Sequence, residues 1–247
     1  MGFFDHIRAV SEHEKSAAVK KLIESSTPQF DFFFMTILSV LMATFGLLEN
    51  SAAVVIGSML IAPVLFPILS LSLSIVMSDY NLIRRSGMTL VKAVVLAVAA
   101  SLLATLFFGT GHEFTPEILA RTQPTLISIA IAVVAGFAVA YTLARENLSE
   151  TLPGIAVAVA LIPPVAVIGI GLAFLNWSVV AGASVFLLVN VVGIVFASML
   201  VFSLMNLYVK RGVAARTATA ADKQVEKEAE KIKAVVQKEE AKAESVS

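Results

Sequence analysis

The chain has 247 residues, of which 58% are apolar and only 15% are Asp, Glu, Lys or Arg. Soluble domains are about half apolar and about a quarter charged, so one soluble core could not hide this much apolar surface, whereas a bilayer could. The net charge is zero and cysteine is absent, which excludes disulfides, thiol catalysis and cysteine metal sites. No basic patch interleaved with aromatic residues is present, so we expect no nucleic-acid partner.

Residues 1–27 predict a cytoplasmic amphipathic leader helix. Apolar side chains such as Ile7 and Leu22 share one face, opposite polar ones such as Lys20 and Lys21. Such a helix can lie on the inner surface of the membrane. It can equally pack on the body of the protein, and the sequence leaves both options open.

Six apolar segments follow the leader, and charges are sparse within most of them. Glu49 is the only charged residue from 32 to 77, and the three charges from 123 to 209 all lie between 145 and 150. Each segment is near or above the roughly 20 residues that cross a bilayer as a helix. We therefore expect an all-α polytopic membrane protein with its transmembrane domain at 28–209. The segments are 31–49, 51–77, 87–108, 124–144, 151–175 and 178–207.

The basic residues predict the orientation of these segments. Six spans place both termini on one side, and ten basic residues fall there, against Arg121 alone on the other side. By the positive-inside rule both termini are cytoplasmic. The ten are Arg8, Lys15, Lys20, Lys21, Arg84, Arg85, Arg145, Lys210, Arg211 and Arg216.

The composition changes from apolar to charged at residue 210, and residues 210–247 predict a charged helical tail in the cytoplasm. Val225, Ala229 and Ile232 recur at helical spacing among Glu and Lys residues, which gives a thin apolar stripe. This is short for a coiled coil. A solvated tail and a helix that binds a partner or a second copy both remain open.

The two halves of the membrane domain resemble each other, with repeat 1 at about 28–108 and repeat 2 at about 122–209. "MLIAPV" (59–64) aligns with "ALIPPV" (160–165), which pairs Pro63 with Pro164. Each unit holds three spans, so the second copy must enter the membrane from the opposite side. Inverted repeats with discontinuous helices at matching places are typical of secondary transporters with a midplane site.

Several motifs in order resemble one family. They are "ENSAAVVIGSMLIAPVLFPILSLSLSI" (49–75), "RTQPTLISIAIAVVAGFAVAY" (121–141), "GIAVAVALIPPVAVIGIGLAF" (154–174) and the segment around Asn190. Over roughly residues 45–205 the chain resembles the membrane domain of the domain of unknown function 389 family. The resemblance implies a bacterial or archaeal cytoplasmic (inner) membrane protein. That family has no assigned biochemical role, so activity stays open.

Prolines interrupt the second and fifth segments, which could be broken spans or re-entrant pairs of half-helices. Proline removes a backbone donor and frees carbonyls, and in lipid these need protein, water or a ligand. Unwound carbonyls suit a cation, and half-helix N-termini suit an anion or polar solute. The alternative is a simple proline kink whose freed carbonyls are satisfied by neighbouring helices. In that case Asn190 would form hydrogen bonds between helices. The predicted substrate-binding residues are Gly57, Ser58, Pro63, Pro67, Pro163, Pro164 and Asn190.

A second group of residues marks a predicted external mouth or gate. It contains Asn50, Arg121, Thr122 and Pro124. Arg121 is suited either to attract an anion or to anchor the chain at the membrane interface. Asn50 and Ser51 are also suited to capping the start of the second segment.

The leading hypothesis is a secondary-transporter-like carrier of a small polar or ionic solute that binds between the two discontinuous helices. A channel is one alternative, and a non-transporting scaffold or sensor that acts through the tail is another. The absence of a nucleophile with a base argues against an enzyme, and we expect no metal and no cofactor. Stripes of small residues on the third and fourth spans favour close helix packing, and a homo-oligomer is expected. They are Ala93, Ala97, Ser101 and Thr105, then Ala132, Gly136, Ala140 and Ala144.

Overall fold

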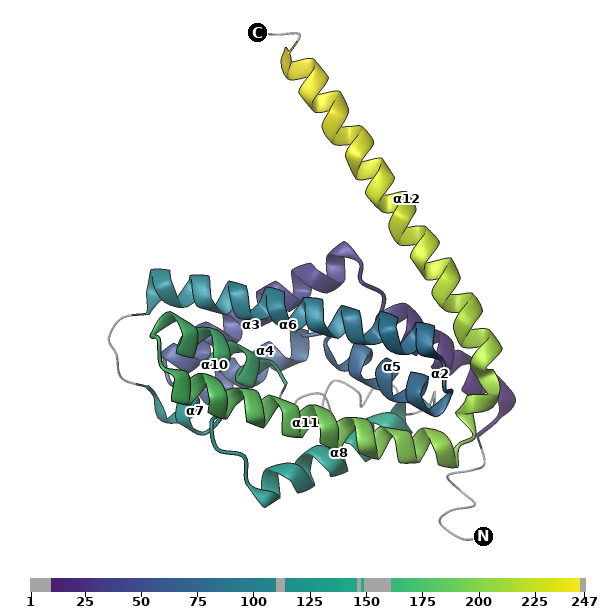
Figure 1. The fold of residues 1–247 in the computed structure, drawn as a ribbon, viewed down its shortest axis with the longest axis horizontal. Helices are drawn as coiled ribbons and strands as arrows, with labels where there is room; N and C mark the ends of the chain where they lie inside the picture. The colour runs from purple at the N-terminus through teal and green to yellow at the C-terminus, as the bar shows by residue number, and fades with distance from the viewer. Residues whose placement is uncertain (1–9, 110–113, 146–147, 149–160, 245–247) are drawn as a thin grey trace.

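The computed structural model describes residues 10–109, 114–145, 148 and 161–244, and these residues form helices without any strand. The all-α prediction is therefore confirmed for this part of the chain (Figure 1). The helices are α2 (Glu12–Ser25), α3 (Phe30–Leu48), α4 (Ala52–Ile61), α5 (Leu65–Val76), α6 (Tyr80–Phe108), α7 (Pro116–Leu119), α8 (Leu126–Leu143), α10 (Ile162–Ala173), α11 (Trp177–Leu204), η2 (Leu207–Lys210) and α12 (Arg211–Glu244).

Four of these helices, α3, α6, α8 and α11, are long and apolar enough to cross a membrane. The predicted break in the second segment is present, because α4 and α5 meet at a 54° bend and could form a fifth span. In the fifth predicted segment α10 is a shorter apolar helix, and residues 149–160 lie outside the described residues. The described chain thus has the composition of a multi-pass membrane protein.

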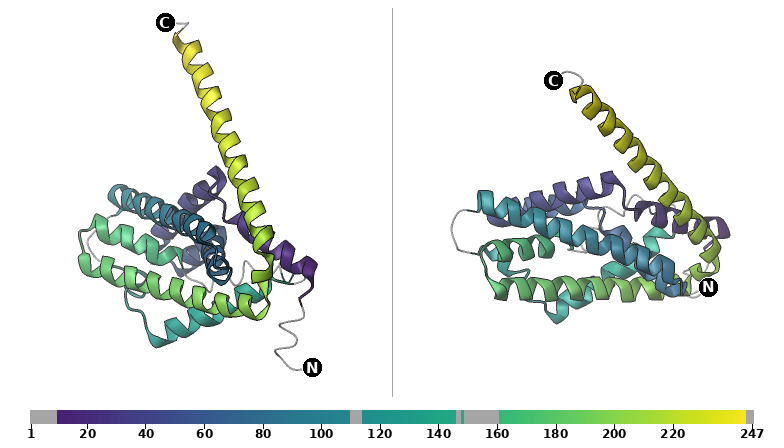
Figure 2. Two further views of the ribbon diagram at one scale, coloured as in Figure 1. Left: turned by 45° about the vertical axis from the view of Figure 1, so that its right-hand side comes forward. Right: turned by 45° about the horizontal axis from the view of Figure 1, so that its top comes forward.

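The two longest apolar helices, α6 and α11, form the centre of the molecule. They run in opposite directions, and α5 and α10 lie between them (Figures 1 and 2). α5 and α10 each pack against both of them. On the outside, α3 packs against α6 and α10, and α8 packs along α11. Each long helix is thus flanked by one short helix from its own half of the chain and one from the other half.

The corners that lead into α6 and α11 share one backbone design. Ser78 and Leu175 both have a positive φ, of 51° and 54°. The next residues, Asp79 and Asn176, cap the following helix through a side-chain oxygen. The amide N–H of each capping residue also donates to a carbonyl five residues earlier, at 3.1 and 2.8 Å. These equivalent positions differ by 97 residues, and so do the first residues of α5 and α10.

The predicted small-residue stripes are buried between helices. The stripe on α6, from Ala93 to Thr105, is at most 1% exposed. A Cβ on Gly169 of α10 would lie 2.5 Å from the Cβ of Ser101, so these two backbones are in close approach. On α8, a Cβ on Gly136 would lie 2.8 Å from the Cα of Ile194 in α11. The stripes therefore pack helices within this chain, as expected.

The leader and the tail meet at one end of the molecule. α2 packs against α5 and α12 and buries Val19, Leu22 and Ile23, so the leader packs on the protein body; residues 1–9 lie outside the described residues. The first turns of α12 bury Ala214 and Ala218. Farther along, α12 projects away from the other helices (Figure 2).

Candidate functional site

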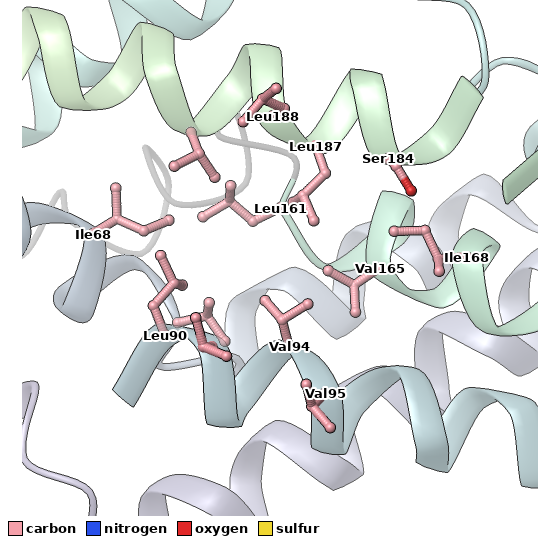
Figure 3. Close-up of a pocket in the computed structure, with 13 residues that line it drawn as sticks. Ile68, Leu90, Val94, Val95, Leu161, Val165, Ile168, Ser184, Leu187 and Leu188 are labelled. Carbon is pink, nitrogen blue, oxygen red and sulfur yellow. The ribbon is translucent and has the colours of Figure 1, made fainter. Parts of the chain in front are cut away.

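A pocket of about 370 Å³ lies where the starts of α5 and α10 face the middle of α6 and α11. α6 and α11 form two opposite walls, and side chains of α5 and α10 close the other two sides (Figure 3). Its lining residues are Val64, Ile68, Leu90, Val91, Val94, Val95, Leu161, Val165, Ile168, Ser184, Leu187, Leu188 and Val191. This volume is in the range of small-molecule sites.

The lining repeats itself across the two halves of the chain. Ten of the thirteen residues form five pairs separated by 97 residues, the same spacing that relates the two corners. In Figure 3, Ile68 and Val165 face each other from opposite ends of the pocket, and Leu90 faces the wall that carries Leu187. The pairs are Val64 and Leu161, Ile68 and Val165, Leu90 and Leu187, Val91 and Leu188, and Val94 and Val191.

The chemistry of this lining is apolar. Among the described residues that line the pocket, Ser184 is the only one with a polar side chain, and its hydroxyl already donates to the carbonyl of Val180 at 2.7 Å. Such a wall can remove apolar surface from water but offers little to a bare ion. Within the described residues, no group of three or more His, Asp or Glu residues could hold a metal ion.

The predicted prolines lie beside this pocket without lining it. Pro67 and Pro164 are each the third residue of their helix, and both are buried. Pro163 is the residue before Pro164, and half-buried Pro63 lies in the connection between α4 and α5. The helix register therefore pairs Pro67, rather than Pro63, with Pro164. Lining residues directly follow Pro63, Pro67 and Pro164 in the chain.

Gly57, Ser58 and Asn190 have separate surroundings. A Cβ on Gly57 would lie 3.1 Å from the end of the Met42 side chain. The hydroxyl of Ser58 donates to the carbonyl of Val55, and its own carbonyl accepts from the Ser39 hydroxyl at 2.7 Å. Ser58 thus ties α4 to α3. Asn190 is 4% exposed and precedes Val191, a lining residue, in α11.

The predicted mouth residues gather around α7, at the end of the molecule opposite the leader. The side-chain oxygen of Asn50 accepts from the backbone N–H of Glu117 at 3.2 Å, and Arg121 forms an ion pair with Glu117 at 3.1 Å. The Thr122 carbonyl closely approaches Gly182 of α11, and Pro124 is half-buried.

The expected cap at the start of α4 is wrong. Ser51 is at the N-cap position but makes no side-chain cap hydrogen bond. Asn50 instead has a left-handed backbone, with φ 53°. Asparagine tolerates this left-handed conformation better than most residues. Its side-chain oxygen accepts from the backbone N–H of Glu117 in α7 and does not cap α4.

Sequence reasoning missed both the apolar pocket and Lys92. The lining residues are Val, Leu and Ile, which no local pattern separates from the other apolar residues of a membrane segment. Lys92 lies inside the third predicted segment and is exposed on α6. Its signal was visible as a lone charge in an apolar run, which marks a functional position by default.

Comparison with known proteins places the chain in a family. A family described as a domain of unknown function (DUF389) matches residues 59–196. The chain belongs to the DUF389 family. The matched range holds every residue that lines the apolar pocket, so the paired lining is part of the DUF389 unit.

One curated relative is an uncharacterised protein, MJ0678, from the archaeon Methanocaldococcus jannaschii. The two sequences are 34% identical over 171 residues, which is 68% of this chain and 52% of the relative. This DUF389 chain thus spans about half the length of that relative. No solved structure matches the chain.

Proposed function

We propose that this DUF389 protein is a carrier of a small molecule with an apolar body, which binds between α5, α6, α10 and α11. The single observation that carries the proposal is the pocket lined by five residue pairs at one constant spacing. A pocket at the meeting point of two equivalent halves is the place where repeat-built transporters bind their substrate.

The arrangement of the helices supports two inverted repeats, at about 28–108 and 122–209. α6 and α11 are equivalent by spacing yet run in opposite directions. α5 packs against α6 of its own half and also against α11 of the other half. In the same way, α10 packs against α11 of its own half and against α6 of the other half. Movement of one such unit against the other would expose the shared pocket to each side of the membrane in turn.

The proposed substrate differs from the polar or ionic solute that the prolines suggested. The pocket offers one hydroxyl among aliphatic side chains, so burial of apolar surface would supply most of the affinity. At roughly 25 cal/mol per Å² of apolar surface, an aliphatic or aromatic body gains more here than a hydrated ion, which would lose its water.

The distribution of charge supports a cytoplasmic location for both described ends of the chain. Lys210 pairs with Glu12 of α2 and Arg211 pairs with Asp79 at the start of α6, at the end where the leader and the tail meet. Arg121 lies at the opposite end, on the turn after α7. With the positive-inside rule, the leader and tail end faces the cytoplasm of a bacterial or archaeal cell.

Thermal stability of the purified protein tests the site. Ligands that bind only the folded state raise apparent stability, so a panel of small aliphatic, aromatic, polar and ionic compounds is measured by its effect on Tm. We expect apolar compounds to raise the Tm of the wild type. Leu90→Trp and Leu187→Trp each fill the pocket from one repeat, and both should abolish that increase.

The matched control is Leu103→Trp, because Leu103 lies on the same helix as Leu90 and is 54% exposed. This variant should keep the response of the wild type. Stabilisation only by ions or polar solutes, or a full response in both pocket-filling variants, would rule out the proposed site.

A second candidate, a membrane scaffold, rests on α12. Ile232 and Val235 on its projecting part are 57% and 58% exposed, and such side chains suit contact with a partner helix. Truncation after residue 224 distinguishes the two functions. A carrier should keep saturable uptake in proteoliposomes without this segment, whereas a scaffold should lose its cellular partner.

A further inference from the structure

We propose that the outer face of α6 binds the phosphate of an anionic phospholipid, with Arg84 and Lys92 as the charges that recognise it. The inference requires that α6 crosses the membrane, for which its 29 residues and apolar composition suffice. It does not depend on the carrier function, because neither Arg84 nor Lys92 lines the apolar pocket.

Lys92 is the observation that calls for a ligand. It is exposed on α6, and the structure gives it no hydrogen bond or ion pair with any described residue. It lies seven residues beyond Arg85, which is about 10 Å deeper along the helix axis. A charged side chain facing hydrocarbon is costly unless it finds a partner or extends to the interface. Side chains on a helix lean toward its N-terminus, so the ammonium of Lys92 is directed back toward the turn of Arg84.

Arg84 shares this face of the helix. Arg84, Met88 and Lys92 follow one another at intervals of four residues, so they form one row along α6. Arg84 is exposed and also has no hydrogen bond or ion pair with a described residue. Two cations without a hydrogen bond or ion pair to any described residue therefore flank Met88, which is itself 49% exposed.

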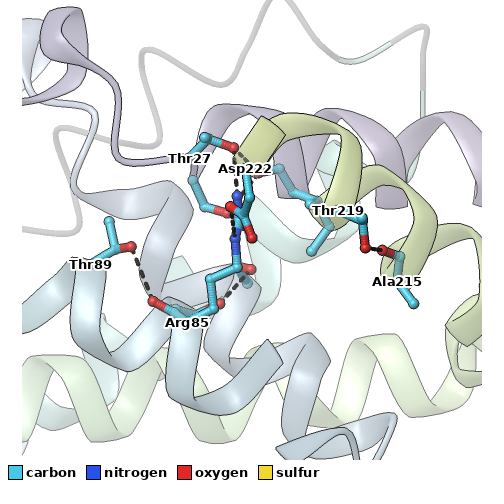
Figure 4. Close-up of polar contacts among 10 residues, drawn as sticks. Thr27, Arg85, Thr89, Ala215, Thr219 and Asp222 are labelled. Atoms are coloured by element: carbon cyan, nitrogen blue, oxygen red, sulfur yellow. Dashed lines mark hydrogen bonds and ion pairs between the residues drawn. The ribbon is translucent and has the colours of Figure 1, made fainter. Parts of the chain in front are cut away.

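A polar pocket of about 420 Å³ lies beside this row, between the first turns of α6 and α12. Its two carboxylates are already paired, Asp222 with Arg85 at 2.8 Å and Asp79 with Arg211 at 3.2 Å. Figure 4 shows Arg85 turned toward Asp222 and Thr27. The acidic groups of the pocket are thus neutralised, and the guanidinium of Arg84 remains for an anion.

The depth of the row favours a phospholipid over a free phosphate. Arg84 lies near the polar end of α6, whereas Lys92 is followed by Val95, which is 63% exposed. A phosphate at the membrane interface would lie between the two cations, and its acyl chains would continue along the exposed apolar surface. Free phosphate could use Arg84 but would gain nothing from the apolar turns below.

The experiment measures stabilisation of the full chain in detergent micelles with added lipid. Phosphatidylglycerol should raise the Tm, while phosphatidylcholine and sodium phosphate at equal concentration should leave it unchanged. Arg84→Gln and Lys92→Gln should each weaken the apparent affinity for phosphatidylglycerol roughly fivefold, because one cation near an anionic surface contributes about that much. Lys92→Arg should retain the wild-type affinity, since it keeps the charge.

Arg216→Gln is the matched control, since Arg216 is an exposed cation on α12 outside this pocket; its affinity should stay within a factor of two of the wild type. Equal stabilisation by phosphatidylcholine or by sodium phosphate would overturn the proposal. So would an Arg84→Gln, Lys92→Gln double variant that folds and binds phosphatidylglycerol as the wild type does.

Discussion

At the scale of single residues, Ser101 joins three helices. Its hydroxyl accepts from the Thr44 hydroxyl of α3 at 2.8 Å and donates to the carbonyl of Ala166 in α10 at 2.7 Å. Gly169 lies directly against it. A buried hydroxyl with both partners satisfied specifies how helices pack where the surroundings are equally apolar on all sides.

Gly169→Ala should destabilise the protein by about 1–3 kcal/mol, the usual range for overpacking a close contact. Its Cβ would lie 2.5 Å from the Cβ of Ser101 and 2.8 Å from the Val98 carbonyl, and the backbone cannot move aside freely. Gly87→Ala is the control on α6, because a Cβ there meets nothing within 4 Å. It should be neutral or stabilising by up to about 1 kcal/mol. Chemical unfolding in micelles measures both, and equal effects would contradict this account of the contact.

Sequence patterns foresaw the small-residue stripes because repeated small side chains at intervals of four can serve only close packing. They did not foresee the pocket, since Leu90 and Leu187 differ from their apolar neighbours only in what they face. The polar site expected at the prolines followed from freed carbonyls and half-helix N-termini at two matched breaks. The structure leaves Pro63 half-buried and places an aliphatic residue, Val64, at the pocket instead.

At the scale of elements, α12 and the short helix η2 before it are held to the body by charge as well as by buried alanines. Lys210 forms an ion pair with Glu12 at 2.9 Å, and Asp222 forms one with Arg85 at 2.8 Å. The hydrogen bonds from Lys15 and Lys210 lower the pKa of Glu12 from 4.5 to about 2. These contacts connect the leader, the first turns of α6 and the tail.

The Glu12 contact should fail only in acid. Because its pKa is lowered, its stabilisation is complete above about pH 4.5 and decreases as the pH falls toward about 2. Spin labels on cysteines introduced at Lys21 and Lys223, in a chain without native cysteine, would report the distance between α2 and α12. We expect a constant distance from pH 8 to 5 and a broader, longer distribution below about pH 4. A change between pH 8 and 5 would show that another group controls the contact.

The Asp222 pair should make a small contribution. Its carboxylate is 53% exposed, and exposed ion pairs contribute about 0.2–1 kcal/mol. Asp222→Asn should therefore accelerate amide hydrogen exchange in the first turns of α12 up to about fivefold, with little change in Tm. Lys223→Gln, a charge removed at the next position, should leave exchange unchanged. Equal acceleration in both variants would indicate a general effect of charge on the helix.

The start of a helix was predictable where the capping residue directly precedes the apolar run. It was less predictable where polar turns lie between the two. The third segment was expected from residue 87, yet α6 begins at Tyr80. Its first turns carry Arg84 and Arg85, which are good helix formers but lower the hydropathy. The N-cap Asp79 starts the helix in the polar region, and the apolar run begins two turns later.

At the scale of the whole molecule, the proposed repeat of two equivalent halves would account for the paired residues of the pocket. The motif alignment suggested a repeat but paired Pro63 with Pro164. The equal lengths of α5 and α10 and their matching corners shift the pairing to Pro67. Short motifs with two nearby prolines cannot fix a register by themselves, whereas helix length and corner geometry can.

The most direct test of the central claim is thiol accessibility at the pocket. Leu90→Cys and Leu187→Cys each place a single thiol in a chain that has none, one in each repeat. If the pocket is a carrier site between inverted repeats, both thiols should react with a membrane-impermeant maleimide added from either side of the membrane. Ile118→Cys, at a buried position outside the pocket, should react from neither side. Labelling of the two pocket thiols from only one side, or only by a lipid-soluble reagent, would contradict the account.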